Sequence, residues 1–133
     1  MPKVKDDHWC FACGTENPHG LHLTGFREEA GDLVLDLTLE RCHQGWQGIA
    51  HGGLVATVLD ETMTTLLYAR GQDAVTAELT VRYHRPVPTG APLQARARQV
   101  AQRGRVVQIE SELRDAQGER LASAQGKFML VER

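Results

Sequence analysis

Several features that mark other classes of protein are scarce in this sequence of 133 residues. Lys and Arg total 15 against 17 Asp and Glu, so the net charge is -2, and a chain without a basic excess is a poor non-specific binder of nucleic-acid backbones. The three cysteines, Cys10, Cys13 and Cys42, are odd in number and clustered early. We therefore expect no disulfide framework and a reducing, cytoplasmic compartment.

Long apolar runs are also missing. No N-terminal stretch joins a basic region to an apolar run and a cleavage site, so we predict no signal peptide. The most apolar segment, residues 52–69, is interrupted by Asp60, Glu61 and several threonines, which makes it a poor membrane span. We expect neither a membrane nor a nucleic acid as a partner.

The length suits one domain, which we expect to occupy residues 1–133. Residues 1–20 form its irregular N-terminal arm, because Cys, Gly, Asn and Pro cluster there. Residues 21–28 are a candidate first strand, and a loop rich in Gly, Gln and His occupies residues 40–51. A long helix is predicted for residues 52–70, since Gly71 supplies a stop signal.

Alternation of apolar and polar residues predicts a strand before the helix and four after it. The expected inward-facing residues, strand by strand, are Leu33, Leu35, Leu37 and Leu39; Val75, Ala77, Leu79, Val81 and Tyr83; Leu93, Ala95 and Ala97; Val107, Ile109, Ser111 and Leu113; and Ala122, Ala124, Gly126, Phe128 and Leu130. Short turns make the later strands antiparallel, and their apolar face needs the helix as its cover. The predicted fold class is α+β: one long central helix wrapped by an antiparallel sheet of five to six strands.

One stripe of the predicted helix is polar and lies opposite its apolar arc. Thr57, Asp60, Glu61, Thr64 and Tyr68 recur at helical spacing along it. A plain interpretation is a solvated face. The side chains, however, are mostly small, whereas long Lys and Glu side chains usually cover such faces. This favours a functional stripe.

The helix begins with His51, Gly52 and Gly53, and glycines in the first turn leave backbone N–H groups approachable at the positive end of the helix dipole. Such donors can stabilise the oxyanion of a thioester under attack. The alternative is a tight loop-to-helix junction. Asp60 lies two turns further on and can act as general base or nucleophile, while Glu61 projects about 100° around the helix. Periodicity does not choose between the two acids.

The segment HGGLVATVLDE at residues 51–61, preceded by QGWQGI at residues 44–49, resembles hotdog-fold acyl-CoA thioesterases of the phenylacetate-degradation (PaaI-like) type. The segments CFACGTENPHGL at residues 10–21 and TAELTVRYHRP at residues 76–86 are also similar to members of that family. The resemblance covers nearly the whole chain. It implies a hotdog fold and hydrolysis of an acyl- or aryl-CoA to a free acid and CoA.

The resemblance also implies roles for individual residues. Asp60 takes the place of the catalytic acid, and the backbone N–H of Gly52 or its neighbour Gly53 takes that of the oxyanion donor. His51 supports the loop and the thioester carbonyl. Thr76, on the strand after the helix, holds the attacking water. Family members form homodimers or homotetramers in which two helices pack face to face and each site draws on both protomers.

One position departs from the family pattern: Gly45 stands where some members have Asn or Gln. Gln44 and Gln47 are the candidate substitutes. The full set of candidate substrate-binding residues is Gln44, Trp46, Gln47, Glu61, Thr64, Arg82, Arg85 and Arg105. Trp46 lines an acyl pocket or staples the loop to the core. The arginines are suited to CoA phosphates, although charged residues at sheet edges have the same appearance.

Cys10 and Cys13, with His19 and His22, have the look of a zinc knuckle. The Cys-to-His spacing is shorter than in a zinc finger and no second CxxC exists, so a turn packed by small thiols is the preferred interpretation. We expect no catalytic metal and no cofactor. The rival functions are a hotdog dehydratase or hydratase and a non-catalytic acyl-CoA-binding module. Asp60 argues against a pure binder, which has no need of a carboxylate beside an anionic ligand.

Overall fold

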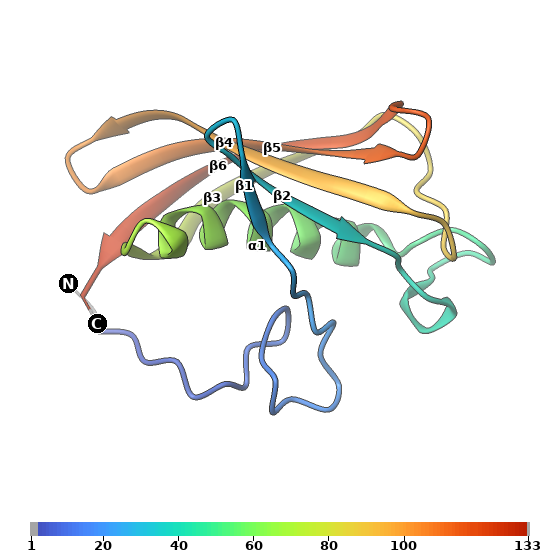
Figure 1. Cartoon of the computed structure of the whole chain (residues 1–133), viewed down its shortest axis with the longest axis horizontal. Helices are drawn as coiled ribbons and strands as arrows, with labels where there is room; N and C mark the ends of the chain where they lie inside the picture. The colour runs from blue at the N-terminus through green and yellow to red at the C-terminus, as the bar shows by residue number, and fades with distance from the viewer. Residues whose placement is uncertain (1–2, 133) are drawn as a thin grey trace.

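The computed structural model describes residues 3–132 and contains one long helix against one antiparallel sheet of six strands (Figure 1). The elements in chain order are β1 (Arg27–Glu29), β2 (Asp32–Leu37), the 3-10 helix η1 (Arg41–His43), α1 (Gly52–Ala69), β3 (Asp73–Tyr83), β4 (Leu93–Arg103), β5 (Val106–Asp115) and β6 (Arg120–Val131). The strand order is β1-β2-β4-β5-β6-β3. The predicted α+β architecture is confirmed, and β3 lies at one edge of the sheet.

Helix α1 packs its apolar face on the sheet. Val55, Val58, Leu59, Thr62, Met63, Leu66 and Leu67 are buried there. The small residues predicted on β6 explain how closely the two elements approach. A Cβ added to Gly126 would lie 3.2 Å from Cε of Met63 and 2.5 Å from the ring of Phe128. Glycine at this position therefore lets the helix lie directly against the strand.

The predicted first strand is mostly wrong. Only residues 27–29 pair with β2. Residues just before them hydrogen-bond instead to the N-terminal arm: Leu21 N–H donates to Phe11 O and Leu23 N–H to Ala12 O, both at 2.8 Å. Leu23 is buried in the core cluster together with Ala12. This stretch therefore fastens the arm to the body of the protein.

The register predicted for β3 is also wrong in its first half. A bulge interrupts the pairing of β3 with β6 between Thr76 and Glu78. It reverses the faces on its N-terminal side, so Val75 is 39% exposed while Ala74 packs against the core. Ala77, also predicted to point inward, is exposed. Simple alternation cannot reveal an extra residue of this kind.

The N-terminal arm lies on the side of α1 away from the sheet (Figure 1). The arm begins beside the end of β6, where Val4 N–H donates to Glu132 O at 3.0 Å. Within residues 3–132, no helix is long and apolar enough to cross a membrane.

Candidate active site

The start of helix α1 presents two hydrogen-bond donors. His51 is the N-cap residue, and its Nδ1 accepts from Gly53 N–H at 3.0 Å. A neutral imidazole whose Nδ1 accepts must carry its proton on Nε2, so this exposed side chain offers an Nε2–H donor. The first amide of the helix, Gly52 N–H, has no intrahelical acceptor because of its position. Of the two glycine amides, Gly53 is thus engaged by His51, whereas Gly52 has no acceptor within the helix.

Tyr83 fixes this end of the helix to the sheet. Its hydroxyl donates to the carbonyl oxygen of Gly52 across 31 residues of sequence. A Cβ on Gly52 would lie 3.5 Å from the Tyr83 ring, which is ordinary van der Waals contact. Partial burial raises the pKa of Tyr83 above its usual value, so the phenol stays a donor. Sequence reasoning missed this role, since it placed Tyr83 only as an inward-facing strand residue.

Asp60 of α1 and Thr76 of β3 lie together further along the helix from His51. The Thr76 hydroxyl donates to Oδ1 of Asp60 at 2.8 Å, which the β3 bulge makes possible by turning Thr76 toward the helix. Burial raises the pKa of Asp60, and the bond from Thr76 partly opposes that rise. The carboxylate is therefore oriented and more basic than an exposed one. Its Oδ2 is the oxygen that remains to accept a proton.

The neighbouring acid, Glu61, points elsewhere. It lies under the N-terminal arm beside the thiol of Cys13, and one of its oxygens accepts from the Thr65 hydroxyl at 3.4 Å. Burial is the main cause that raises its pKa; the hydrogen bond from Cys13 acts in the opposite direction. The two carboxylates, which periodicity left equivalent, thus have different surroundings: Asp60 faces β3 and Glu61 faces the arm.

The polar stripe satisfies much of its own hydrogen bonding. The Thr57 hydroxyl donates to Gly53 O at 2.9 Å and the Thr64 hydroxyl to Asp60 O at 3.0 Å, both one turn back along the helix. Each of these hydroxyls thus uses its donor within the helix. The part of the stripe at Thr57 and Thr64 is small and half-buried, whereas Tyr68 further along is 58% exposed.

The predicted loop residues lie before the helix. Oε1 of Gln44 accepts from Gly48 N–H at 3.2 Å, so this side chain supports the loop. Gln47 is exposed and Trp46 is 83% exposed, which leaves the indole off the core. A Cβ at Gly45 would lie 3.5–3.8 Å from His51 atoms. The position that departs from the family pattern therefore adjoins the histidine.

The three predicted arginines do not form one cluster. Arg82 and Arg85 are exposed near the end of β3, and Arg85 pairs with Glu119 at 3.5 Å. Arg105 lies in the turn between β4 and β5, at the opposite end of the sheet from the start of α1 (Figure 1). Within a single chain, only the first two lie toward the His51 end.

Comparison with known protein families places the chain in one of them. The family model of the thioesterase superfamily matches residues 47–122, which include the helix, Thr76 and Tyr83. The chain belongs to the thioesterase superfamily. No curated protein matches the sequence significantly.

Several solved structures superpose on most of the chain. One is protein RHA08564, a thioesterase superfamily protein, with 28% identity and a TM-score of 0.83 over 97% of this chain and 72% of that one. Another is protein BH2602 from Bacillus halodurans with CoA, with 29% identity and a TM-score of 0.72 over 82% and 74% of the chains. A third is a phenylacetic acid degradation-related protein from Ralstonia eutropha, with 26% identity and a TM-score of 0.71 over 79% and 83%. The hotdog fold and the resemblance to the phenylacetate-degradation type are confirmed.

Proposed function

We propose that the protein is an acyl-CoA thioesterase, which hydrolyses an acyl- or aryl-CoA to the free acid and CoA. The observation that carries the proposal is the pairing of two kinds of group on one helix. His51 Nε2–H and Gly52 N–H are donors for a carbonyl oxygen, and Asp60, oriented by Thr76, is a carboxylate for the attack. The family supplies the reaction class, thioester hydrolysis.

The proposed reaction uses these groups as follows. The carbonyl oxygen of the thioester accepts from His51 Nε2–H and Gly52 N–H, which stabilise the negative charge that develops on it. Asp60 removes a proton through Oδ2 from a water held near Thr76, and the water oxygen attacks the carbonyl carbon. The C–S bond then breaks, and CoA leaves as a thiolate that takes up a proton. Direct attack by Asp60 to give an anhydride, followed by hydrolysis, is the alternative role of the same carboxylate.

We propose further that each active site is shared between two chains. Gly53 and Asp60 are about 10 Å apart along one helix axis, at 1.5 Å per residue. A water within about 3 Å of both the carbonyl carbon and the base cannot bridge that separation. An antiparallel helix from a second chain brings its own Asp60 beside the first chain's His51. The proposed assembly is a homodimer or a dimer of dimers.

Several surface features of the chain support this assembly. The stripe at Thr57 and Thr64 is small and hydrogen-bonded internally, so it can be buried at little cost. β3 is an edge strand, whose unpaired backbone groups need a partner or a cover. Val75 is 39% and Tyr83 50% exposed on that strand. A second copy of the chain would cover these groups together.

CoA is the proposed leaving group. BH2602, a relative at 29% identity, was crystallised with CoA. Arg82 is exposed near the His51 end and is a candidate for the CoA phosphates, because guanidinium groups pair bidentately with phosphate. Arg85 is a weaker candidate, since Glu119 already pairs with it.

A thiol-release screen tests the proposed function. The protein is mixed with straight-chain and aryl acyl-CoAs and a thiol reagent, and the free CoA thiol is measured against time. Release from at least one acyl class, with turnover, is the expected result. Calorimetric binding of acyl-CoAs without release by any of them would contradict hydrolysis and identify a binding module.

A further inference from the structure

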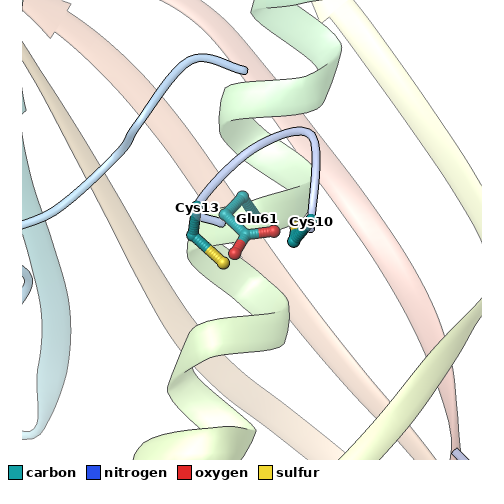
Figure 2. A group of neighbouring side chains, drawn as sticks. All are labelled: Cys10, Cys13 and Glu61. Atoms are coloured by element: carbon teal, nitrogen blue, oxygen red, sulfur yellow. The ribbon is translucent and has the colours of Figure 1, made fainter. Parts of the chain in front are cut away.

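A second cluster of reactive side chains lies on a different face of α1 from the one that meets Thr76. It joins Cys10 and Cys13 of the N-terminal arm to Glu61 of the helix (Figure 2). The two sulfur atoms and a carboxylate oxygen of Glu61 all lie within 4.8 Å of one another. Sequence spacing could not predict this cluster, because Glu61 is 48 residues from the nearer cysteine.

We propose that Cys10, Cys13 and Glu61 bind a zinc ion that fastens the N-terminal arm to helix α1. Zinc–sulfur bonds of about 2.3 Å and zinc–oxygen bonds of about 2.0–2.2 Å place tetrahedral ligand atoms about 3.4–3.8 Å apart. The three atoms are therefore within about an ångström of ligand positions. Two soft thiolates with a carboxylate favour zinc over magnesium or calcium, which take oxygen ligands only. Water fills the fourth position.

Backbone hydrogen bonds and close packing hold the turn that carries the cysteines. Gly14 N–H donates to Cys10 O at 2.8 Å, and Glu16 N–H to His8 O at 2.9 Å. A Cβ at Gly14 would lie 2.4 Å from the backbone nitrogen of Cys10, so only glycine fits there. Ala12, between the cysteines, is buried in the core. Both thiols are thus held toward the helix, and little chain entropy is lost on binding an ion.

The electrostatic surroundings favour a cation. Glu61 has Asp60 beside it and Asp6 nearby, and both raise its pKa by repulsion. Burial, Glu61 and Cys10 all raise the pKa of Cys13. A divalent ion bound here would interact favourably with these carboxylates, and its binding would release the protons of the two thiols.

The proposed zinc is structural and takes no part in hydrolysis. Asp60 faces Thr76 on β3, whereas Glu61 points about 100° away around the helix toward the arm. The histidines of the arm do not belong to the cluster: within residues 3–132 only the two thiols and the carboxylate meet there, and His22 Nε2 lies against Asn17 O. The ion would instead tie the N-terminal arm to Glu61, the residue that follows Asp60.

Metal titration of the full-length protein tests the site. Reduced, metal-free protein is titrated with Co²⁺ and then Zn²⁺, and absorbance and bound metal are measured. We expect one ion per chain, thiolate-to-cobalt charge-transfer bands with tetrahedral d–d bands, displacement by zinc, and a higher melting temperature with zinc. Absence of these bands and of stoichiometric zinc binding would overturn the proposal.

Matched cysteine variants assign the ligands. Cys10→Ser, Cys13→Ser and Glu61→Gln should each weaken zinc binding about tenfold or more, as loss of a metal-site partner does. Cys42→Ser removes the exposed cysteine outside the cluster and should bind zinc as the wild type does. Cys10 is also exposed, so Cys10→Ser should fold even if Cys13→Ser does not, and it can then test the site alone. Unchanged zinc affinity in Cys10→Ser, or loss of zinc affinity in Cys42→Ser, would contradict the assignment. Thiol release from acyl-CoA is measured separately, because it tests the proposed hydrolysis and not the zinc site.

Discussion

Two neighbouring acids of helix α1, Asp60 and Glu61, are candidates for the chemistry. Asp60 and Glu61 are adjacent, both half-buried, and both have raised pKa values because of burial. Their partners distinguish them. Asp60 accepts from Thr76, and its free oxygen can meet a water, whereas Glu61 lies against the thiols of the arm. We therefore assign the chemistry to Asp60.

Replacing Asp60 tests this assignment. Asp60→Asn keeps the size and the hydrogen bond from Thr76 but removes the base, so kcat should fall about a hundredfold or more with little change in melting temperature. Steady-state thiol release and thermal unfolding measure the two effects. Glu61→Gln is the comparison variant. Near-wild-type turnover by Asp60→Asn, together with a larger loss in Glu61→Gln, would move the chemistry to Glu61.

Substitution of Gly52 tests its N–H as the proposed oxyanion donor. Gly52→Pro removes the N–H at the first helical position, where proline is tolerated, and His51 already has the extended backbone (φ -60°, ψ 130°) that precedes proline. Loss of one oxyanion donor should lower kcat about 10²–10³-fold. Gly52→Ala is the matched control: it adds a Cβ 3.5 Å from Tyr83 but keeps the N–H, so its kcat should be far less affected. Equal kcat values in the two variants would show that this amide is not the donor.

Periodicity and residue type predicted part of the candidate site from the sequence. The helical repeat placed Asp60 on a polar stripe, and the two glycines indicated a bare helix start. The sequence could not show that Gly53 is engaged by His51, because that depends on one side-chain torsion. Thr76 came from family resemblance alone, since strict alternation turns it away from the helix and only the bulge turns it back.

At the scale of elements, the helix and the four later strands were predictable because their apolar periodicities are long and regular. The alternation that begins at Leu33 was predictable for the same reason and forms β2. The candidate first strand at residues 21–28 was not, since Leu21 and Leu23 anchor the arm rather than extend a strand.

Ion pairs also join strands β2 and β4. The buried side chain of Asp32, at the start of β2, pairs with Arg96 at 3.0 Å and with Arg98 at 3.2 Å on β4.

The Asp32 pairs predict a pH dependence of stability. Hydrogen bonds from Arg98, and to a lesser extent from Arg96, lower the pKa of Asp32 below its ordinary 3.8, although burial acts against them. A carboxylate with a lowered folded-state pKa stabilises the protein above its unfolded pKa, and this contribution is lost as the pH falls through the folded value. Asp32→Asn should therefore be less stable than the wild type at pH 7, by a margin that shrinks in acid.

Urea unfolding at neutral and acidic pH measures that margin. Asp36→Asn is the control on the same strand: its side chain is 62% exposed and pairs with Arg27, so its loss should matter less at neutral pH. A margin for Asp32→Asn that stays constant from pH 7 to below pH 3 would show that the ion pairs do not carry the effect.

For the molecule as a whole, the proposed mechanism makes the site of a single chain incomplete. The donors at the helix start and the carboxylate of the same helix are too far apart for one water to bridge, and the edge strand β3 is uncovered. We therefore predict at least a dimer at working concentration. Multi-angle light scattering combined with activity in the same fractions checks it. An active monomer would rule out a shared site.

Subunit mixing tests whether Asp60 of one chain acts on a thioester held at His51 and Gly52 of another. Differently tagged Asp60→Asn and Gly52→Pro chains are co-expressed, and the heterodimer is purified through both tags. In the shared-site arrangement, one of its two sites carries both lesions and the other carries neither, so thiol release should recover to about half of the wild-type rate per dimer. If verified heterodimers remain as inactive as the two homodimers, catalysis lies within one chain and the account is contradicted.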